Sequence, residues 1–119
     1  MKINIESRDE LRVIDLSEII YLQASHNYTD FHFTDGRVKS VLSNLSSIEH
    51  LIGDSAARVG GLNPFVRLGR SILVNTSYVE LVSVKLRLLA FRTTPAITLT
   101  LSRAHLLQLK ELLTGGGVE

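Results

Sequence analysis

Hydrophobic and polar residues alternate along much of the chain, and this period of two is typical of half-buried β-strands. The clearest case is the segment 97–101, where Ile97, Leu99 and Leu101 are separated by threonines. Three more segments alternate in the same way, and the residues predicted to point inward are Ile20, Leu22 and Ala24; Thr29, Phe31 and Phe33; and Leu86, Leu88 and Ala90. Shorter strands are predicted at residues 3–7, 11–15, 38–42, 65–68, 72–75 and 78–84.

Turn-forming residues separate these segments, most clearly Arg8-Asp9-Glu10, Asp35-Gly36 and Thr93-Thr94-Pro95. Asp35-Gly36 lies between two alternating runs, which is a strong signal for a β-hairpin. Many short strands joined by tight turns favour antiparallel sheets over parallel βαβ units. We therefore predict a mainly β fold.

Two segments have the spacing of amphipathic helices instead. The first has its apolar stripe within residues 45–52, and Ser46 together with Glu49 fits a capping box at its start. The second follows Ser102, which is a suitable N-cap, and its stripe consists of Leu106, Leu109 and Leu113. These leucines, like Phe31, Phe33, Phe65 and Phe91, are expected in the core.

The glycines define the remaining organisation of the chain. Residues 53–63 contain three glycines without a clear period, so we predict a loop there. The run Gly115-Gly116-Gly117 cannot continue the second helix. A length of 119 residues is that of one domain. We expect a single domain over residues 1–114 and a flexible, glycine-rich tail at 115–119.

Composition excludes several classes of protein. The sequence has no cysteine, which excludes disulfide bonds, thiolate metal sites and cysteine nucleophiles. No apolar run approaches the roughly 20 residues that a membrane-spanning helix needs. Acidic residues interrupt the N-terminal segment early, which is unlike a signal peptide. We therefore predict a cytoplasmic protein with no membrane partner.

The net charge of +1 conceals an uneven distribution. Residues 1–64 carry six basic and nine acidic side chains, whereas residues 65–110 carry seven basic side chains and one acidic side chain, Glu80. A polyanion responds to the local potential, so the basic C-terminal half is a candidate surface for nucleic acid. The alternative is that these basic residues only solvate strand faces.

Signatures of catalysis are missing from the sequence. It contains no phosphate-binding glycine-rich motif, helical zinc motif or nucleophile elbow. His26 and His32 could approach each other in a hairpin, but a metal site would need a further ligand of suitable geometry. We predict no catalytic residue, no metal site and no cofactor, and hence a protein that is not an enzyme.

Several segments, taken in order, resemble the LytTR-type DNA-binding domain of bacterial transcription regulators. Residues 18–24 lead into Asn27-Tyr28-Thr29 and a turn at 35–37, and an amphipathic helix follows around 45–52. The most specific segment is 65–75, with the pattern Phe-x-Arg-x-x-Arg-Ser-x-x-Val-Asn, and Leu101-Ser102-Arg103 then opens the last helix. The resemblance extends over residues 2–113.

The resemblance implies an elongated antiparallel β fold of short sheets with one or two short helices. Members of this family insert loop residues into successive major grooves, often at direct repeats. The implied partners are double-stranded promoter DNA with such repeats, a second copy of the chain on that DNA, and an upstream receiver or sensor domain outside this chain. The loops that contact DNA match the turn at Asn27 and Tyr28, the loop from Arg67 through Arg70 to Ser71, and the helix start at Arg103.

The residues themselves single out Arg70 as a candidate for reading bases. It stands between Gly69 and Ser71 before a hydrophobic strand, a setting that suits a loop tip in close approach to another molecule. Arginine can donate two hydrogen bonds to one guanine, which lysine cannot copy. Ser71 and the backbone near it could bind phosphate. The alternative for Arg70 is a surface residue at a strand edge.

Four other candidates have structural alternatives. Arg103 lies in the first turn of a helix, where the helix dipole disfavours a cation. This unfavourable position indicates either a functional role for Arg103 or an ion pair with one of the N-terminal acids. Arg67 pairs either with phosphate or with Glu80. Tyr28 either stacks on a sugar or touches a base edge, or it is simply an exposed strand tyrosine. His105 either reaches phosphate or stays on the helix surface.

Two functional hypotheses follow. The first is sequence-specific binding of double-stranded DNA by a bacterial transcription regulator, with Arg70 and Arg103 as base readers. The second is a β-rich protein-interaction domain of the same fold that does not bind DNA by itself. The low net charge and Gly69, where the family usually has histidine, motivate the second hypothesis.

Overall fold

The computed structural model describes residues 1–115, which form ten strands in three antiparallel sheets and two α-helices. The domain is elongated, with principal extents of 48 × 28 × 26 Å. The sheets are the hairpin β1(Lys2–Glu6)–β2(Leu11–Asp15); the five-stranded sheet β5(Val38–Val41), β4(Tyr28–Phe33), β3(Ile19–Ser25), β7(Ile72–Asn75), β6(Phe65–Leu68); and the three-stranded sheet β10(Ile97–Thr100), β9(Leu88–Phe91), β8(Val79–Ser83). The predicted mainly β, antiparallel fold of short sheets is confirmed.

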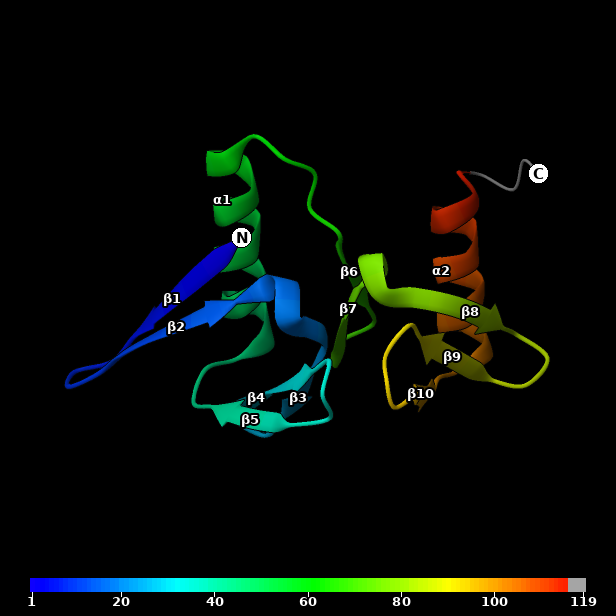
Figure 1. Ribbon diagram of the computed structural model, residues 1–119, viewed down its shortest axis with the longest axis horizontal. Coiled ribbons are helices and arrows are strands. Elements are labelled where there is room, and N and C mark those ends of the chain that lie inside the picture. Colours follow the sequence, from blue (N-terminus) through cyan, green and yellow to red (C-terminus); the bar gives the residue numbers. More distant parts are fainter. Residues whose placement is uncertain (116–119) are drawn as a thin grey trace.

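The two helices cover opposite sides of the central strands, as Figure 1 shows. Helix α1(Leu45–Val59) packs with the β1–β2 hairpin around a first core that includes Leu22, Phe31 and Leu73. Helix α2(Arg103–Thr114) packs with the three-stranded sheet around a second core that includes Val74 and Phe91. Strands β3 and β7 contribute to both cores and are buried on both faces.

Strand β3 changes its inward face at a β-bulge. Ile19 pairs with Phe33 and Tyr21 pairs with His32, so Ile20 is the extra residue of the bulge. As a result Ile20 packs into the second core, whereas Leu22 packs into the first. The predicted common face is therefore confirmed for Leu22 and Ala24 but wrong for Ile20, because the bulge resets the alternation of side chains.

The strand predicted around residues 86–90 also differs from expectation. Residues 84–87 form the β8–β9 turn, in which Arg87 has a φ of +56°, and β9 begins only at Leu88. Leu89 and Phe91 are its buried residues, not Leu86, Leu88 and Ala90. Apolar residues occupy both faces of this segment, so the alternation alone could not choose the inward one. By contrast, the predicted inward face of Thr29, Phe31 and Phe33 is confirmed.

Helix α1 begins earlier and ends later than the sequence pattern predicted. Its N-cap is Asn44, whose Oδ1 accepts a hydrogen bond from the Ser47 amide (2.8 Å), so the expected capping box at Ser46 is wrong. The helix also runs through most of the predicted loop at 53–63 and ends at Gly60, which has a φ of +70°. Small side chains here let the helix approach β1 closely, and the Ser55 hydroxyl donates to the Lys2 carbonyl (2.9 Å).

The ends of helix α2 follow the sequence more closely. The Ser102 hydroxyl accepts a hydrogen bond from the His105 amide (3.2 Å), which confirms the predicted N-cap. Leu106 and Leu109 are buried, but Leu113 is exposed, because the last turn extends past the second core. Gly115 ends the helix as its C-cap, and the other residues of the predicted tail, 116–119, lie outside the described residues.

The buried Asn75 ties the two central strands together. Its side-chain amide donates to the Ile19 carbonyl (2.9 Å), and its Oδ1 accepts from the Ser77 amide (3.0 Å). We expect Asn75→Ala to lower the free energy of unfolding by about 1–3 kcal/mol, since it leaves polar partners unsatisfied inside the protein. Urea unfolding measures this loss. The exposed Asn4→Ala is the control, and an equal loss in both variants would contradict the assignment.

His32 makes the stability depend on pH. Its ring stacks on Tyr21, with ring centroids 4.0 Å apart, and burial lowers the pKa of His32 although Asp30 partly opposes this. The unfolded chain therefore takes up a proton on His32 more readily than the folded protein does, and stability falls as the pH drops below about 6.5. We expect His32→Phe, which keeps an aromatic ring, to lose less stability between pH 7.5 and pH 5.5. Equal losses in urea unfolding would rule out His32 as the cause.

Candidate nucleic-acid interface

The β3–β4 turn and the β6–β7 turn lie side by side at one end of the central sheet. Strands β3 and β7 are antiparallel neighbours, with Gln23 opposite Ile72. Beyond that pair, the Ala24 amide donates to the Ser71 carbonyl (2.8 Å). This bond brings Asn27 and Tyr28, which follow β3, close to the turn that carries Arg70 and Ser71.

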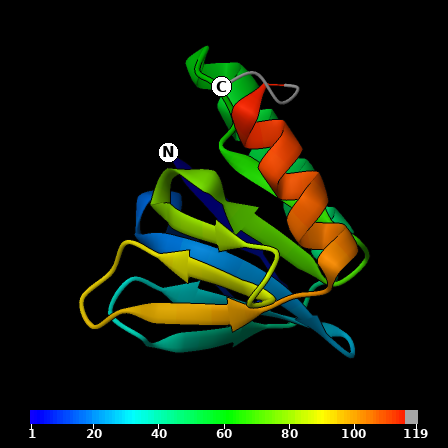
Figure 2. The same cartoon turned by 90° about the vertical axis from the view of Figure 1, so that its right-hand side faces the viewer.

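The start of helix α2 reaches the same place from the other core. A Cβ atom added at Gly69 would lie 2.6 Å from Nε2 of His105, so the imidazole occupies the space beside this glycine. Gly69 has a φ of +66°, a conformation that favours glycine. Figure 2 shows the β3–β4 turn, the β6–β7 turn and the beginning of α2 along the same side of the molecule.

The β3–β4 turn presents Asn27 and Tyr28 to solvent. His26 has a φ of +56° and forms the tight turn together with Asn27. Tyr28 is 46% exposed, whereas the next residue, Thr29, is fully buried and donates its hydroxyl hydrogen to the Ser43 carbonyl (2.8 Å). The alternation of the strand therefore directs the tyrosine ring outward while Thr29 anchors the base of the turn.

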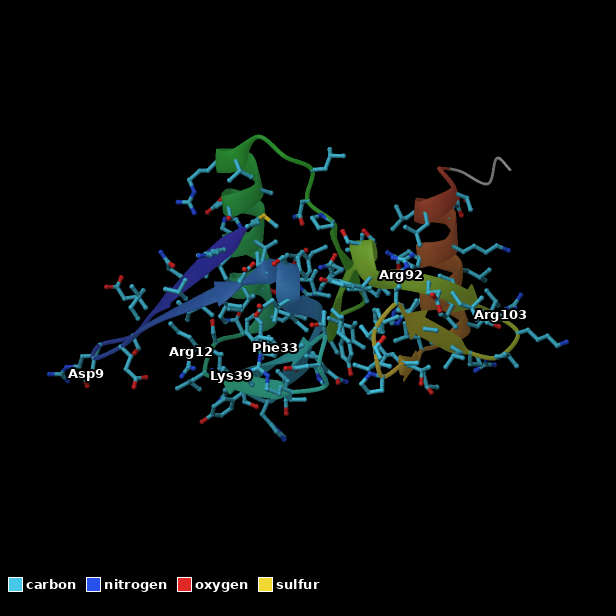
Figure 3. All side chains as sticks on the ribbon, viewed as in Figure 1. Asp9, Arg12, Phe33, Lys39, Arg92 and Arg103 are labelled. Carbon is cyan, nitrogen blue, oxygen red and sulfur yellow. The ribbon has the colours of Figure 1, made fainter. Side chains whose placement is uncertain are left out.

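Arg70 and Arg103 are exposed arginines with unengaged side chains. Neither guanidinium forms a hydrogen bond or an ion pair with any residue between 1 and 115. The alternative prediction, an ion pair between Arg103 and an N-terminal acid, is not found there. Figure 3 shows the reason, because Arg103 lies at the opposite end of the molecule from Asp9 at the tip of the β1–β2 hairpin. Ser71 is exposed beside Arg70.

Arg67 differs from these two residues because each nitrogen of its guanidinium donates to a protein oxygen. NH1 donates to Oε1 of Glu49 on α1 (2.6 Å), Nε donates to the Gly69 carbonyl (3.1 Å), and NH2 donates to the Arg70 carbonyl (2.8 Å). Of the two alternatives for Arg67, pairing with Glu80 is wrong, since the acidic partner is Glu49. Glu49 is 18 positions away in the sequence, and only the packing of α1 against the sheet brings the two charges together.

His105 is half-buried rather than on the free surface of the helix. Its ring lies against Gly69, and one turn further along α2 the Gln108 side chain donates to the Arg67 carbonyl (3.5 Å). The sequence offered no sign of this contact, since glycine and histidine are 36 positions apart. The structure thus brings the first turns of α2 into contact with the loop that carries Arg70.

Two basic residues beside this surface were not among the candidates. Lys85 and Arg87 are exposed in the β8–β9 turn, and the Arg87 carbonyl accepts a hydrogen bond from the Leu101 amide (3.2 Å), just before α2. The excess of basic residues in the C-terminal half was the signal that could have identified them. Arg92 is occupied instead, since it donates to the carbonyls of Ser77 and Val79 (3.2 and 3.3 Å; Figure 3).

Other kinds of site find no support in the described part of the chain. His32 lies opposite Tyr21, far along the hairpin from the turn that holds His26, so the two histidines do not meet. Residues 1–115 contain no group of three or more His, Cys, Asp or Glu side chains that could hold a metal ion. Neither described helix has the length and hydrophobicity needed to cross a bilayer.

Comparisons with known proteins agree with this geometry. The family model of the LytTr DNA-binding domain matches residues 9–114. A solved structure, described as the LytTr DNA-binding domain of a methyl-accepting/DNA response regulator from Bacillus cereus, is similar with a TM-score of 0.63. The similarity covers 94% of this chain and 95% of that one at 16% sequence identity, which shows a shared fold. No curated protein matches the chain. Because the family model spans nearly the whole sequence, this chain belongs to the LytTR family of DNA-binding domains.

Proposed function

We propose that the chain is the sequence-specific DNA-binding domain of a bacterial transcription regulator and inserts loop residues into the major groove of double-stranded DNA. Family membership supports DNA binding in general. The observation that carries the finer proposal is the meeting of three separate segments on one side of the domain, where the side chains of Arg70 and Arg103 have no protein partner among residues 1–115. Free guanidinium groups on a short turn and at the start of a helix suit the edges of base pairs.

In this proposal Arg70 and Arg103 read bases. Arg70 lies at the tip of a two-strand turn, where its side chain extends without competition from protein acceptors. Its fork of donors matches O6 and N7 of guanine. Arg103 opens α2, where the helix dipole disfavours a cation, and a nearby anionic backbone would offset that cost.

The neighbouring polar residues position the domain on the DNA backbone. Ser71 offers a hydroxyl next to Arg70, and Asn27 and Tyr28 offer an amide and a phenol on the adjacent turn. His105 offers an imidazole between the two arginine-bearing segments. Contacts of this kind go mostly to phosphates and sugars and set the register of the protein rather than its sequence preference.

The further partners in this proposal follow from the mode of binding. Promoter DNA with direct repeats would be bound by two copies of the domain, one to each repeat. A receiver or sensor domain upstream of this module would supply the input signal. DNA binding would take place in the cytoplasm. The domain itself performs no chemistry on the DNA in this scheme.

The affinity for DNA should depend strongly on salt. We expect the logarithm of the binding constant for the DNA upstream of the encoding gene to fall linearly with the logarithm of salt concentration, by about 0.9 per phosphate contact. Fluorescence anisotropy over a range of potassium chloride concentrations measures this slope. Absence of binding to any promoter fragment would favour the protein-interaction alternative, especially if a pull-down recovered another regulator.

Replacing Arg70 should relax specificity at one base position. We expect Arg70→Ala to cost roughly 1–3 kcal/mol of discrimination at a single base pair, since one bidentate contact is lost. Competition assays with a set of single-base variants of the binding site measure the change. Arg58→Ala, an exposed arginine near the far end of α1, is the control and should keep the preference. An equal loss of affinity for all variants would instead make Arg70 a phosphate contact.

A further inference from the structure

The most constrained cation of the candidate interface is Arg67, and its contacts all point back into the protein. Its three guanidinium nitrogens each donate to a protein oxygen, two of them carbonyls of the turn that presents Arg70. The third donates to Glu49, and only 24% of the Arg67 side chain is exposed. These bonds use three of the five N–H donors of the guanidinium and hold it against the protein.

The two hydrogen bonds from Arg67 to backbone carbonyls hold the β6–β7 turn in one conformation. Gly69 and Arg70 form the tip of the β6–β7 turn, and their carbonyl oxygens both point at the same guanidinium. Because the guanidinium is planar and rigid, two bonds to successive carbonyls fix the path of the backbone between them. That path determines the direction in which the Arg70 side chain leaves the turn.

Glu49 is the acidic partner that holds the Arg67 guanidinium in place. Its carboxylate lies on α1, is partly exposed, and bonds Arg67 at 2.6 Å. A carboxylate near a DNA-binding surface repels phosphates, so simple electrostatics makes it unfavourable for binding. Its position is understandable if its effect on the turn outweighs that repulsion.

A second contact supports the turn from α2. The His105 ring of α2 fills the space beside Gly69, so the turn contacts both this ring and the Arg67 guanidinium, which Glu49 of α1 holds. A preorganised turn loses less conformational freedom on binding, and this raises affinity without adding any contact to the DNA.

We propose that Arg67 and Glu49 form a clamp that positions the β6–β7 turn for base reading, and that Arg67 is a positioning residue rather than a phosphate contact. The inference rests on the proposed DNA-binding function and assigns a role in it to an acidic residue of α1. It makes Glu49 favourable for binding in spite of its charge.

Arg67→Lys separates the two roles of Arg67. Lysine keeps the positive charge but cannot bond three acceptors in one plane. We expect it to weaken specific binding by about three- to tenfold, nearly as much as Arg67→Ala, because the turn must then be ordered on binding. The slope of affinity against salt should stay that of the unmodified protein in both variants. Affinity kept by Arg67→Lys, with a slope reduced by about 0.9 in Arg67→Ala, would identify a phosphate contact and overturn the clamp.

Glu49→Gln provides an independent test with an opposite electrostatic expectation. The clamp predicts weaker specific binding, by a similar factor, although a negative charge has been removed. Asp54→Asn removes an exposed charge from the same helix and should leave affinity unchanged or raise it slightly. If Glu49→Gln strengthens binding as Asp54→Asn does, the clamp is wrong. Urea unfolding of each variant confirms that the comparison is made between folded proteins.

A measurement without DNA distinguishes failure of the clamp from failure of the proposed function. We expect backbone amide order parameters at residues 69–71 to fall in Glu49→Gln and Arg67→Lys but not in Asp54→Asn. An unmodified protein that binds no DNA would refute the proposed function, yet lower order parameters would still support the clamp. Unchanged order parameters in Glu49→Gln would falsify the clamp whether or not the protein binds DNA.

Discussion

The antiparallel pairing of β3 with β7 is the constraint on which the rest of the domain depends. Both strands are buried on both faces, so each supplies side chains to two separate cores. The bulge at Ile20 sets this division in β3, because it places the consecutive residues Ile20 and Tyr21 in the second core. The same pairing, with Gln23 opposite Ile72, also places two turns at one end of the sheet. One register therefore defines the cores and the candidate interface together.

The interface combines exposed groups with groups that are held in place. The side chains of Arg70 and Arg103 have no protein partner among residues 1–115. Arg67 and His105, by contrast, contact the backbone of the β6–β7 turn at Gly69 and Arg70. This division suits a protein that reads DNA through loops, since a loop without support must be ordered at the moment of binding. Support comes from both cores, through Glu49 on α1 and His105 on α2. Both helices thus support the turn that presents Arg70.

Much of the architecture could be predicted because it depends on local preferences. Alternating residues and turn chemistry located the strands within a few positions, and Ser102 correctly predicted the start of α2. The errors arose where local signals were ambiguous. Residues 86–90 are apolar on both faces, and the second half of α1 lacks large apolar residues because it packs closely through small ones. The position of Arg70 on a turn was predicted from its neighbours, but its lack of protein partners was not.

The sequence by itself determined the mainly β character of the chain, the family to which it belongs and the concentration of basic residues in its C-terminal half. These follow from residue order and from preferences that operate over a few neighbouring positions. Only the tertiary structure decided that Arg67 pairs with Glu49 and that His105 of α2 lies on Gly69, beside Arg70. Such contacts join residues many positions apart, and their geometry depends on strand register and helix packing that no local pattern records.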